Sequence, residues 1–166
     1  MKQSNSTILG ISLGAKRTGI AIISYGTLIH WKLHTFFGTW SDRKSQRILD
    51  RYEKYIRTYG AKRIAIKIPP ETHHSTAIVT LLKELLKRCQ YHGCMVEYKT
   101  KAEIKQHIPE VQNATALIQY VTNRFPILTT EQEKEQLNKQ PYQVKMFEAV
   151  LMAHIEHQQI ICNKKR

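Results

Sequence analysis

Carboxylate side chains, the usual ligands for metal-dependent phosphate chemistry, are scarce in this sequence. Aspartate occurs only as Asp42 and Asp50, and the other eleven acidic residues are glutamates. Mg²⁺ is a hard cation that binds oxygen ligands, and a two-metal site needs several carboxylates that converge on one place. The shortage of aspartates therefore argues against a two-metal site in this protein.

Other patterns that could carry chemistry are weaker. Gly10, Gly14 and Gly19 precede no Gly-Lys-Ser/Thr sequence, so we interpret them as turn residues rather than as a phosphate-binding P-loop. His154 and His157 share one face of a predicted helix, but no third metal ligand accompanies them, and we expect a surface pair. No Cys-x-x-Cys pair, zinc-type spacing or Ser-His-Asp pattern occurs in the sequence.

Positive charge is the strongest signal in the composition. The 166 residues include 26 Lys and Arg against 13 Asp and Glu, which gives a net charge of +13. Such an excess favours a polyanionic partner, and nucleic acid is the one we expect. One face of a predicted helix carries four of these cations, which we interpret as a solvated surface: Arg43, Arg47, Arg51 and Lys54.

Length and composition indicate one intracellular domain. Hydrophobic residues make up 42% and charged residues 23%, as is typical of globular proteins. Three cysteines are too few for a disulfide framework, so we expect a reducing cytoplasmic location. No apolar stretch is long enough for a membrane span, and none resembles a signal peptide. We expect a single domain over residues 1–162, a basic tail over residues 163–166 and no membrane partner.

Short apolar segments predict a sheet of five strands. The first three segments are separated by short turns, which indicates an antiparallel meander. The last two alternate with helices, which favours parallel pairing. The predicted strands cover residues 7–13, 19–24, 28–36, 63–68 and 94–98.

Helical periodicity accounts for most of the remaining chain. The first helix is expected to begin after Ser41 or Asp42, which are good N-capping residues, and to end at Gly60. Further helices are expected over residues 74–91, 100–107, 111–123, 130–138 and 142–160. These elements predict an α/β fold in which helices cover both faces of a mixed five-stranded sheet.

The segment Ile8–Ala21, with the sequence ILGISLGAKRTGIA, resembles the first hairpin of RuvC-like nucleases, whose pattern is GIDxGxxRxGxA. That superfamily has the ribonuclease H-like fold and includes Holliday-junction resolvases and the YqgF-type pre-rRNA nucleases. Weaker similarities follow at Ile64–Pro70, Val96–Glu103 and Tyr142–Ile155. The resemblance thus extends over nearly the whole chain and implies the ribonuclease H-like fold.

Family members use three or four carboxylates to hold two divalent ions, which activate water and stabilise the scissile phosphate. The resemblance places these positions at Ser12, Lys67, Lys145 and Glu148. Only Glu148 is a carboxylate, and the two ammonium groups would repel a metal ion. We therefore expect degenerate catalytic positions with no catalytic residue and no bound metal.

Two roles for the altered site are compatible with each other. In the first, Lys67 pairs with Glu148 across the former metal site, and Ser12 forms a hydrogen bond nearby. In the second, the cleft binds phosphate directly, because Lys and Arg do so without a metal. The residues expected to contact nucleic acid are Lys16, Arg17, Lys67, Lys99, Lys101 and Lys105, with Lys145 on the closing helix.

The function that we favour is a non-catalytic nucleic-acid-binding domain, a pseudonuclease that resembles Holliday-junction resolvases and needs no cofactor. One alternative is a divergent Mg²⁺-dependent endonuclease of the resolvase or pre-rRNA-processing type, which would use Glu148 with Glu71 or Glu97. Another is a structural or interaction protein that uses the fold as a scaffold. DNA and RNA are both candidate ligands. Because RuvC-like resolvases act as dimers, the resemblance also makes a homodimer a candidate assembly for this chain.

Overall fold

A computed structural model describes residues 7–138 and 142–165, and this part begins with three antiparallel strands, β1 (Thr7–Ser12), β2 (Arg17–Ser24) and β3 (Thr27–Thr35). Tyr25 and Gly26 join β2 to β3 with φ values of 52° and 82°, the left-handed geometry of a two-residue hairpin turn. β4 (Arg63–Lys67) and β5 (Met95–Lys99) add in parallel, and the strand order is β3-β2-β1-β4-β5. The predicted meander with two parallel strands is confirmed.

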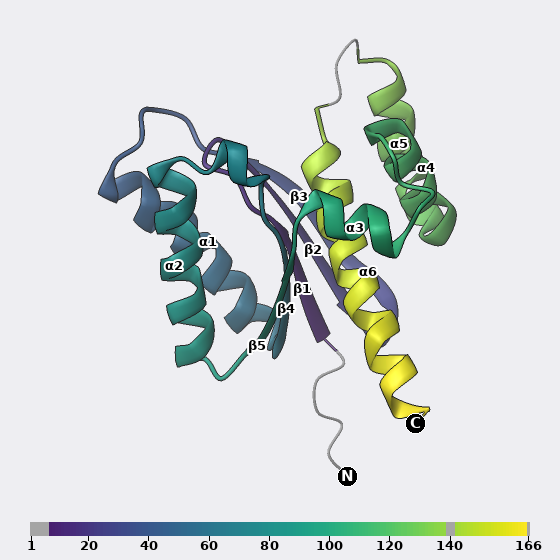
Figure 1. Cartoon of the computed structure of the whole chain (residues 1–166), viewed down its shortest axis with the longest axis horizontal. Coiled ribbons are helices and arrows are strands. Elements are labelled where there is room, and N and C mark those ends of the chain that lie inside the picture. The colour runs from purple at the N-terminus through teal and green to yellow at the C-terminus, as the bar shows by residue number, and fades with distance from the viewer. Residues whose placement is uncertain (1–6, 139–141, 166) are drawn as a thin grey trace.

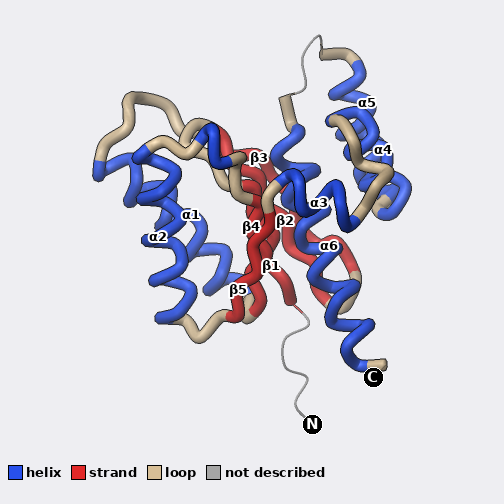
Figure 2. Tube along the Cα trace, viewed as in Figure 1, coloured by secondary structure: helices blue, strands red, loops and turns tan. Residues whose placement is uncertain are grey.

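Helices cover both faces of this sheet, as predicted (Figures 1 and 2). One face carries α1 and α2, and the other carries α3 to α6, with α6 crossing β1, β2 and β4. The helices are α1 (Asp42–Tyr59), α2 (Thr76–Tyr91), α3 (Lys101–His107), α4 (Ala114–Arg124), α5 (Thr129–Gln136) and α6 (Val144–Lys164), with 3-10 turns η1 (Glu71–His73) and η2 (Pro126–Leu128). The two layers of helices bury the central strands β1, β2 and β4, whereas the edge strands β3 and β5 are partly exposed.

Each central strand contributes to two hydrophobic cores, because successive side chains point to opposite faces. In β1, Leu9 and Ile11 pack in the core under α1 and α2. Ile8 packs in the core under α6. A strand buried on both faces must be apolar along its length, which is why these segments read as continuous hydrophobic runs.

α6 lies unusually close to β1 and β2 because glycines face it. A Cβ atom on Gly10 would lie 2.1 Å from the carbonyl oxygen of Ala149, and one on Gly19 would lie 1.8 Å from that of Lys145. No larger residue fits there without displacing the helix backbone. α6 also continues to Lys164, beyond the predicted end at residue 160, so the expected basic tail begins inside the helix. Residue 166 lies outside the described part.

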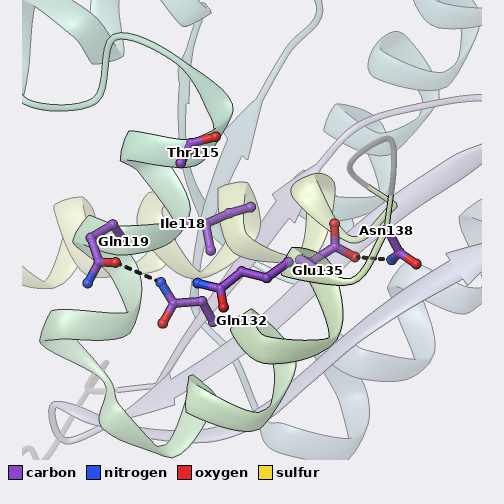
Figure 3. A pocket seen from close by; sticks show the side chains of 7 residues that line it. Thr115, Ile118, Gln119, Gln132, Glu135 and Asn138 are labelled. Atoms are coloured by element: carbon purple, nitrogen blue, oxygen red, sulfur yellow. Dashed lines mark hydrogen bonds between the residues drawn. The ribbon is translucent and has the colours of Figure 1, made fainter.

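The start of α6 is fixed by a carboxylate on α5. Glu135 is buried and accepts hydrogen bonds from the backbone N–H groups of Tyr142 and Gln143, at 2.7 and 2.9 Å. It also accepts one from the side-chain amide of Asn138, at the side of a cavity of about 310 Å³ between α4 and α5 (Figure 3). The carboxylate satisfies N–H groups at the helix start that lack intrahelical partners. We therefore assign Glu135 a structural role.

His154 lies in the core rather than on the surface that the sequence indicated. The residue is 8% exposed, and its ring lies edge-on to the rings of Tyr120 and Phe125. Burial, followed by the charges of Arg124 and His157, lowers the pKa of His154 from 6.5 to about 4. The imidazole is therefore uncharged in the folded protein at neutral pH.

This histidine should make the protein less stable in acid. Its pKa is lower in the folded than in the unfolded state, so the unfolded chain takes up the proton first as pH falls from 6.5 towards 4. We expect His154→Gln to lose about 3 kcal/mol less than the wild type across that window, since the pKa falls from 6.5 to about 4 and one pKa unit corresponds to about 1.4 kcal/mol. Urea unfolding at several pH values measures this, and parallel pH curves for the two proteins would contradict it.

Across residues 7–138 and 142–165, no helix is both long and apolar enough to cross a membrane.

Candidate nucleic-acid interface at the strand ends

The candidate site lies where three strands end side by side. Ser12 on β1 is in register with Lys67 on β4, and Lys67 is in register with Lys99 on β5. The ladder continues past the strands, because Leu13 N–H donates to Lys67 O and Ile68 N–H donates to Lys99 O, both at 3.0 Å. Paired residues of parallel strands point to the same face, so these three side chains form a row on one face of the sheet, and α6 covers that face at β1 and β4.

Glu148 on α6 meets this row and is held by two of its members. The hydroxyl of Ser12 donates to Oε1 of Glu148 at 3.1 Å, and the ammonium of Lys67 pairs with Oε2. The Lys67 and Glu148 side chains are only 10% and 9% exposed, and Ser12 is fully buried. The predicted pair, with Ser12 bonded beside it, is confirmed.

A second ammonium lies beside the pair. Nζ of Lys145 donates to the carbonyl oxygen of Leu13 at 3.1 Å, and the Lys145 side chain passes against Gly14. Burial lowers the pKa of Lys145, Glu148 opposes that shift, and the charge of Lys67 adds to it. The four positions together hold two cationic groups and one carboxylate.

This donor set does not fit two Mg²⁺ ions. It supplies one carboxylate and one hydroxyl, and both oxygens of the carboxylate are already bonded to Lys67 and Ser12. Glu97 lies opposite Ala65 on the edge strand, and Glu71 lies in η1. In the described ranges no three His, Cys, Asp or Glu side chains gather as a metal site would require.

Lysines surround the pair on the side of α3. A cavity of about 50 Å³ is lined by Lys67, Lys101, Lys105 and Glu148, among others. A wider hollow of about 640 Å³ lies next to it and shares Lys101 and Lys105. The remaining residues lining this hollow are Pro70, Glu71, Thr100, Ala102 and Glu103. The structure thus brings together Lys67, Lys101 and Lys105, with Lys99 beside them in the strand register.

Lys16 and Arg17 form a separate group at the β1–β2 connection. Both are exposed and line neither of these two hollows. The guanidinium of Arg17 lies over the ring of Tyr142, 4.3 Å from its centroid, an arrangement that favours a cation. Arg17 pairs with Thr35, the last residue of β3, so this group lies at the same edge of the sheet as Lys67.

Sequence reasoning missed a further basic hollow on α1. Arg47, Arg51 and Lys54 line it together with residues at the end of β3. Their spacing along the helix was visible in the sequence, but the approach of β3 was not.

Comparison with known proteins shows the fold. No family model matches the sequence, and no curated protein matches it. Among solved structures, RuvC from Thermus thermophilus in complex with a Holliday junction substrate aligns with a TM-score of 0.71 and 13% identity, covering 95% of this chain and 96% of that one. RuvC from the same organism in another structure aligns with a TM-score of 0.70 and 13% identity, covering 96% of each. The chain therefore has the RuvC-like form of the ribonuclease H fold along nearly its whole length.

Proposed function

We propose that this chain is a nucleic-acid-binding domain that uses the RuvC-like fold without hydrolysing phosphodiesters. The observation that carries the proposal is the ammonium of Lys67 paired with the carboxylate of Glu148. In the RuvC-like nucleases these positions hold carboxylates that bind metal ions. Here a fixed side-chain cation lies beside the one acid, so the site keeps positive charge without a metal.

The contacts with nucleic acid would be made by the lysines around that pair. Lys99, Lys101 and Lys105 form no ion pair within the described residues, and neither do Lys16 and Arg17. Free ammonium and guanidinium groups bind phosphate oxygens and release counterions from the nucleic acid. Such contacts set position and affinity but read little sequence. We therefore expect nucleic-acid binding that depends steeply on salt, has weak sequence preference and does not require Mg²⁺.

Replacing Lys101 and Lys105 by glutamine should weaken binding to all sequences alike. The test is fluorescence anisotropy with a labelled four-way junction, a duplex DNA and a hairpin RNA, each at two salt concentrations with and without Mg²⁺. We expect the double variant to bind about tenfold more weakly and its salt slope to fall by about 2, about one for each phosphate that a lysine no longer neutralises. The four-way junction is included because the structural neighbour was solved with one.

The matched control removes two exposed cations that line none of the hollows described, in the variant Arg57→Gln/Lys83→Gln. It has the same net charge as the test variant, so a general charge effect would weaken both equally. Equal weakening, or no binding by the wild type at low salt, would contradict the proposed surface. Mg²⁺- or Mn²⁺-dependent cleavage of any of the three ligands would overturn the non-catalytic part of the proposal.

A further inference from the structure

A second basic hollow lies between the end of β3 and α1. Its volume is about 380 Å³, and it is lined by His34, Thr35, Phe36, Arg47, Asp50, Arg51 and Lys54. Because β3 runs in the same direction as β1, Thr35 lies at the same edge of the sheet as Ser12. α1, which contributes four of the lining residues, covers the face of the sheet opposite to α6 (Figure 1). The hollow shares no lining residue with the two hollows near Lys67, Lys101 and Lys105, which form the strand-end surface, and is therefore distinct from that surface.

The charge of this hollow is positive and uncompensated. Arg47, Arg51 and Lys54 form no ion pair among residues 7–138 and 142–165. The one acid, Asp50, already accepts a hydrogen bond from Arg88 at 2.7 Å. Burial, followed by the charge of Arg51, lowers the pKa of His34 to about 4, so this histidine adds no charge at neutral pH. Three free cations in a concave site are suited to an anion such as phosphate.

An exposed aromatic ring follows directly in the chain. Phe37 is 79% exposed, whereas its neighbour Phe36 is buried. The loop that carries Phe37 is held by buried Lys44, which donates from Nζ to Gly38 O at 2.8 Å, and by Phe36 N–H, which donates to Lys16 O at 2.8 Å. Gly38 adopts a φ of 93°, which favours glycine at the turn. The ring is thus presented to solvent by an ordered loop.

We propose that this hollow and Phe37 bind an unpaired segment of nucleic acid, with a phosphate on Arg47 and Arg51 and a base stacked on the ring. The inference rests on the proposed function and extends it. Bases offer a face for stacking only where they are unpaired, and basic grooves with aromatic side chains are typical of single-strand binding. Lys16 and Arg17 lie beside this hollow, because Phe36 N–H donates to Lys16 O and Arg17 pairs with Thr35.

The phosphate contact is tested with Arg47→Gln/Arg51→Gln against the control Arg57→Gln/Lys83→Gln. The ligands are short labelled oligothymidylate and oligouridylate strands and a blunt DNA duplex. We expect the hollow variant to bind both single strands about tenfold more weakly, with a salt slope lower by about 0.7, the value for the one phosphate of the strand that is no longer neutralised. The control variant should retain more of the wild-type affinity for single strands, and more of the wild-type salt slope, than the hollow variant does. Equal slopes for the two variants would overturn the assignment.

The stacking contact is tested with Phe37→Ala, using Tyr91→Ala as the control because Tyr91 is 85% exposed at the far end of α2. We expect Phe37→Ala to weaken single-strand binding about tenfold and to leave duplex binding unchanged. Tyr91→Ala should change neither. Equal losses on single strands and duplex would exclude stacking. Thermal unfolding of each variant shows whether it is folded.

The two proposals can fail separately. If Lys101→Gln/Lys105→Gln weakens binding and the hollow variants behave as their controls do, only this inference fails. If the hollow variants lose affinity and the strand-end variant does not, the strand-end surface fails and the hollow stands. A wild-type protein that binds no nucleic acid at low salt overturns both.

Discussion

Lys67→Ala should lower the free energy of unfolding by about 3 kcal/mol, as expected for one partner of a buried ion pair. The carboxylate of Glu148 would remain buried, 9% exposed, with only the Ser12 hydroxyl as its hydrogen-bond partner. Lys145 donates its hydrogen bond to the carbonyl of Leu13 rather than to Glu148. Urea unfolding followed by circular dichroism measures the change.

A double variant separates the loss of the pair from the loss of packing. Replacing both partners of a buried ion pair by apolar side chains of similar volume is often neutral or stabilising. We therefore expect Lys67→Met/Glu148→Met to recover most of the stability that Lys67→Ala loses. The exposed Lys83→Ala provides the surface control. A loss below about 0.5 kcal/mol for Lys67→Ala, the size of an ordinary surface change, would contradict a stabilising pair.

Restoring acids at the strand ends should make stability depend on a divalent metal. The variant Ser12→Asp/Lys67→Glu places two new carboxyl groups next to Glu148, because all three positions meet in the folded protein. In EDTA, repulsion between these groups should destabilise the variant. A divalent ion at about 100 times its dissociation constant should add about 2.7 kcal/mol, since it binds only the folded state. Thermal unfolding with EDTA, Mg²⁺ or Mn²⁺ measures this.

The control for the metal experiment is Lys67→Gln, which removes the ammonium without adding an acid. We expect neither this variant nor the wild type to be stabilised by Mg²⁺ or Mn²⁺. Stabilisation of the wild type to the same extent as the double variant would show that Lys67 does not take the place of a metal. Absence of any metal response in the double variant would contradict the inferred convergence of the three positions.

The sequence was sufficient for the sheet and for the Lys67–Glu148 pair. Apolar runs and turn residues are local properties, so the strands and most helices could be found from patterns a few residues long. The predicted end of α6 at residue 160 was wrong, since the helix continues to Lys164. No glycine or proline near residue 160 marks where the helix stops. The ion pair was predicted from the resemblance to the family's central strand, which contains Lys67, and to its last helix, which contains Glu148.

The chain alone determined its positive charge, its shortage of aspartates and its order of elements. Tertiary structure decided which cations converge. Arg47 and Arg51 have the spacing of a solvated helix face, and only the approach of β3 turns that face into a hollow. His154 likewise became a core residue because α4 covers it. Such outcomes depend on contacts between segments far apart in sequence, and side-chain periodicity within one element contains no information about its neighbours.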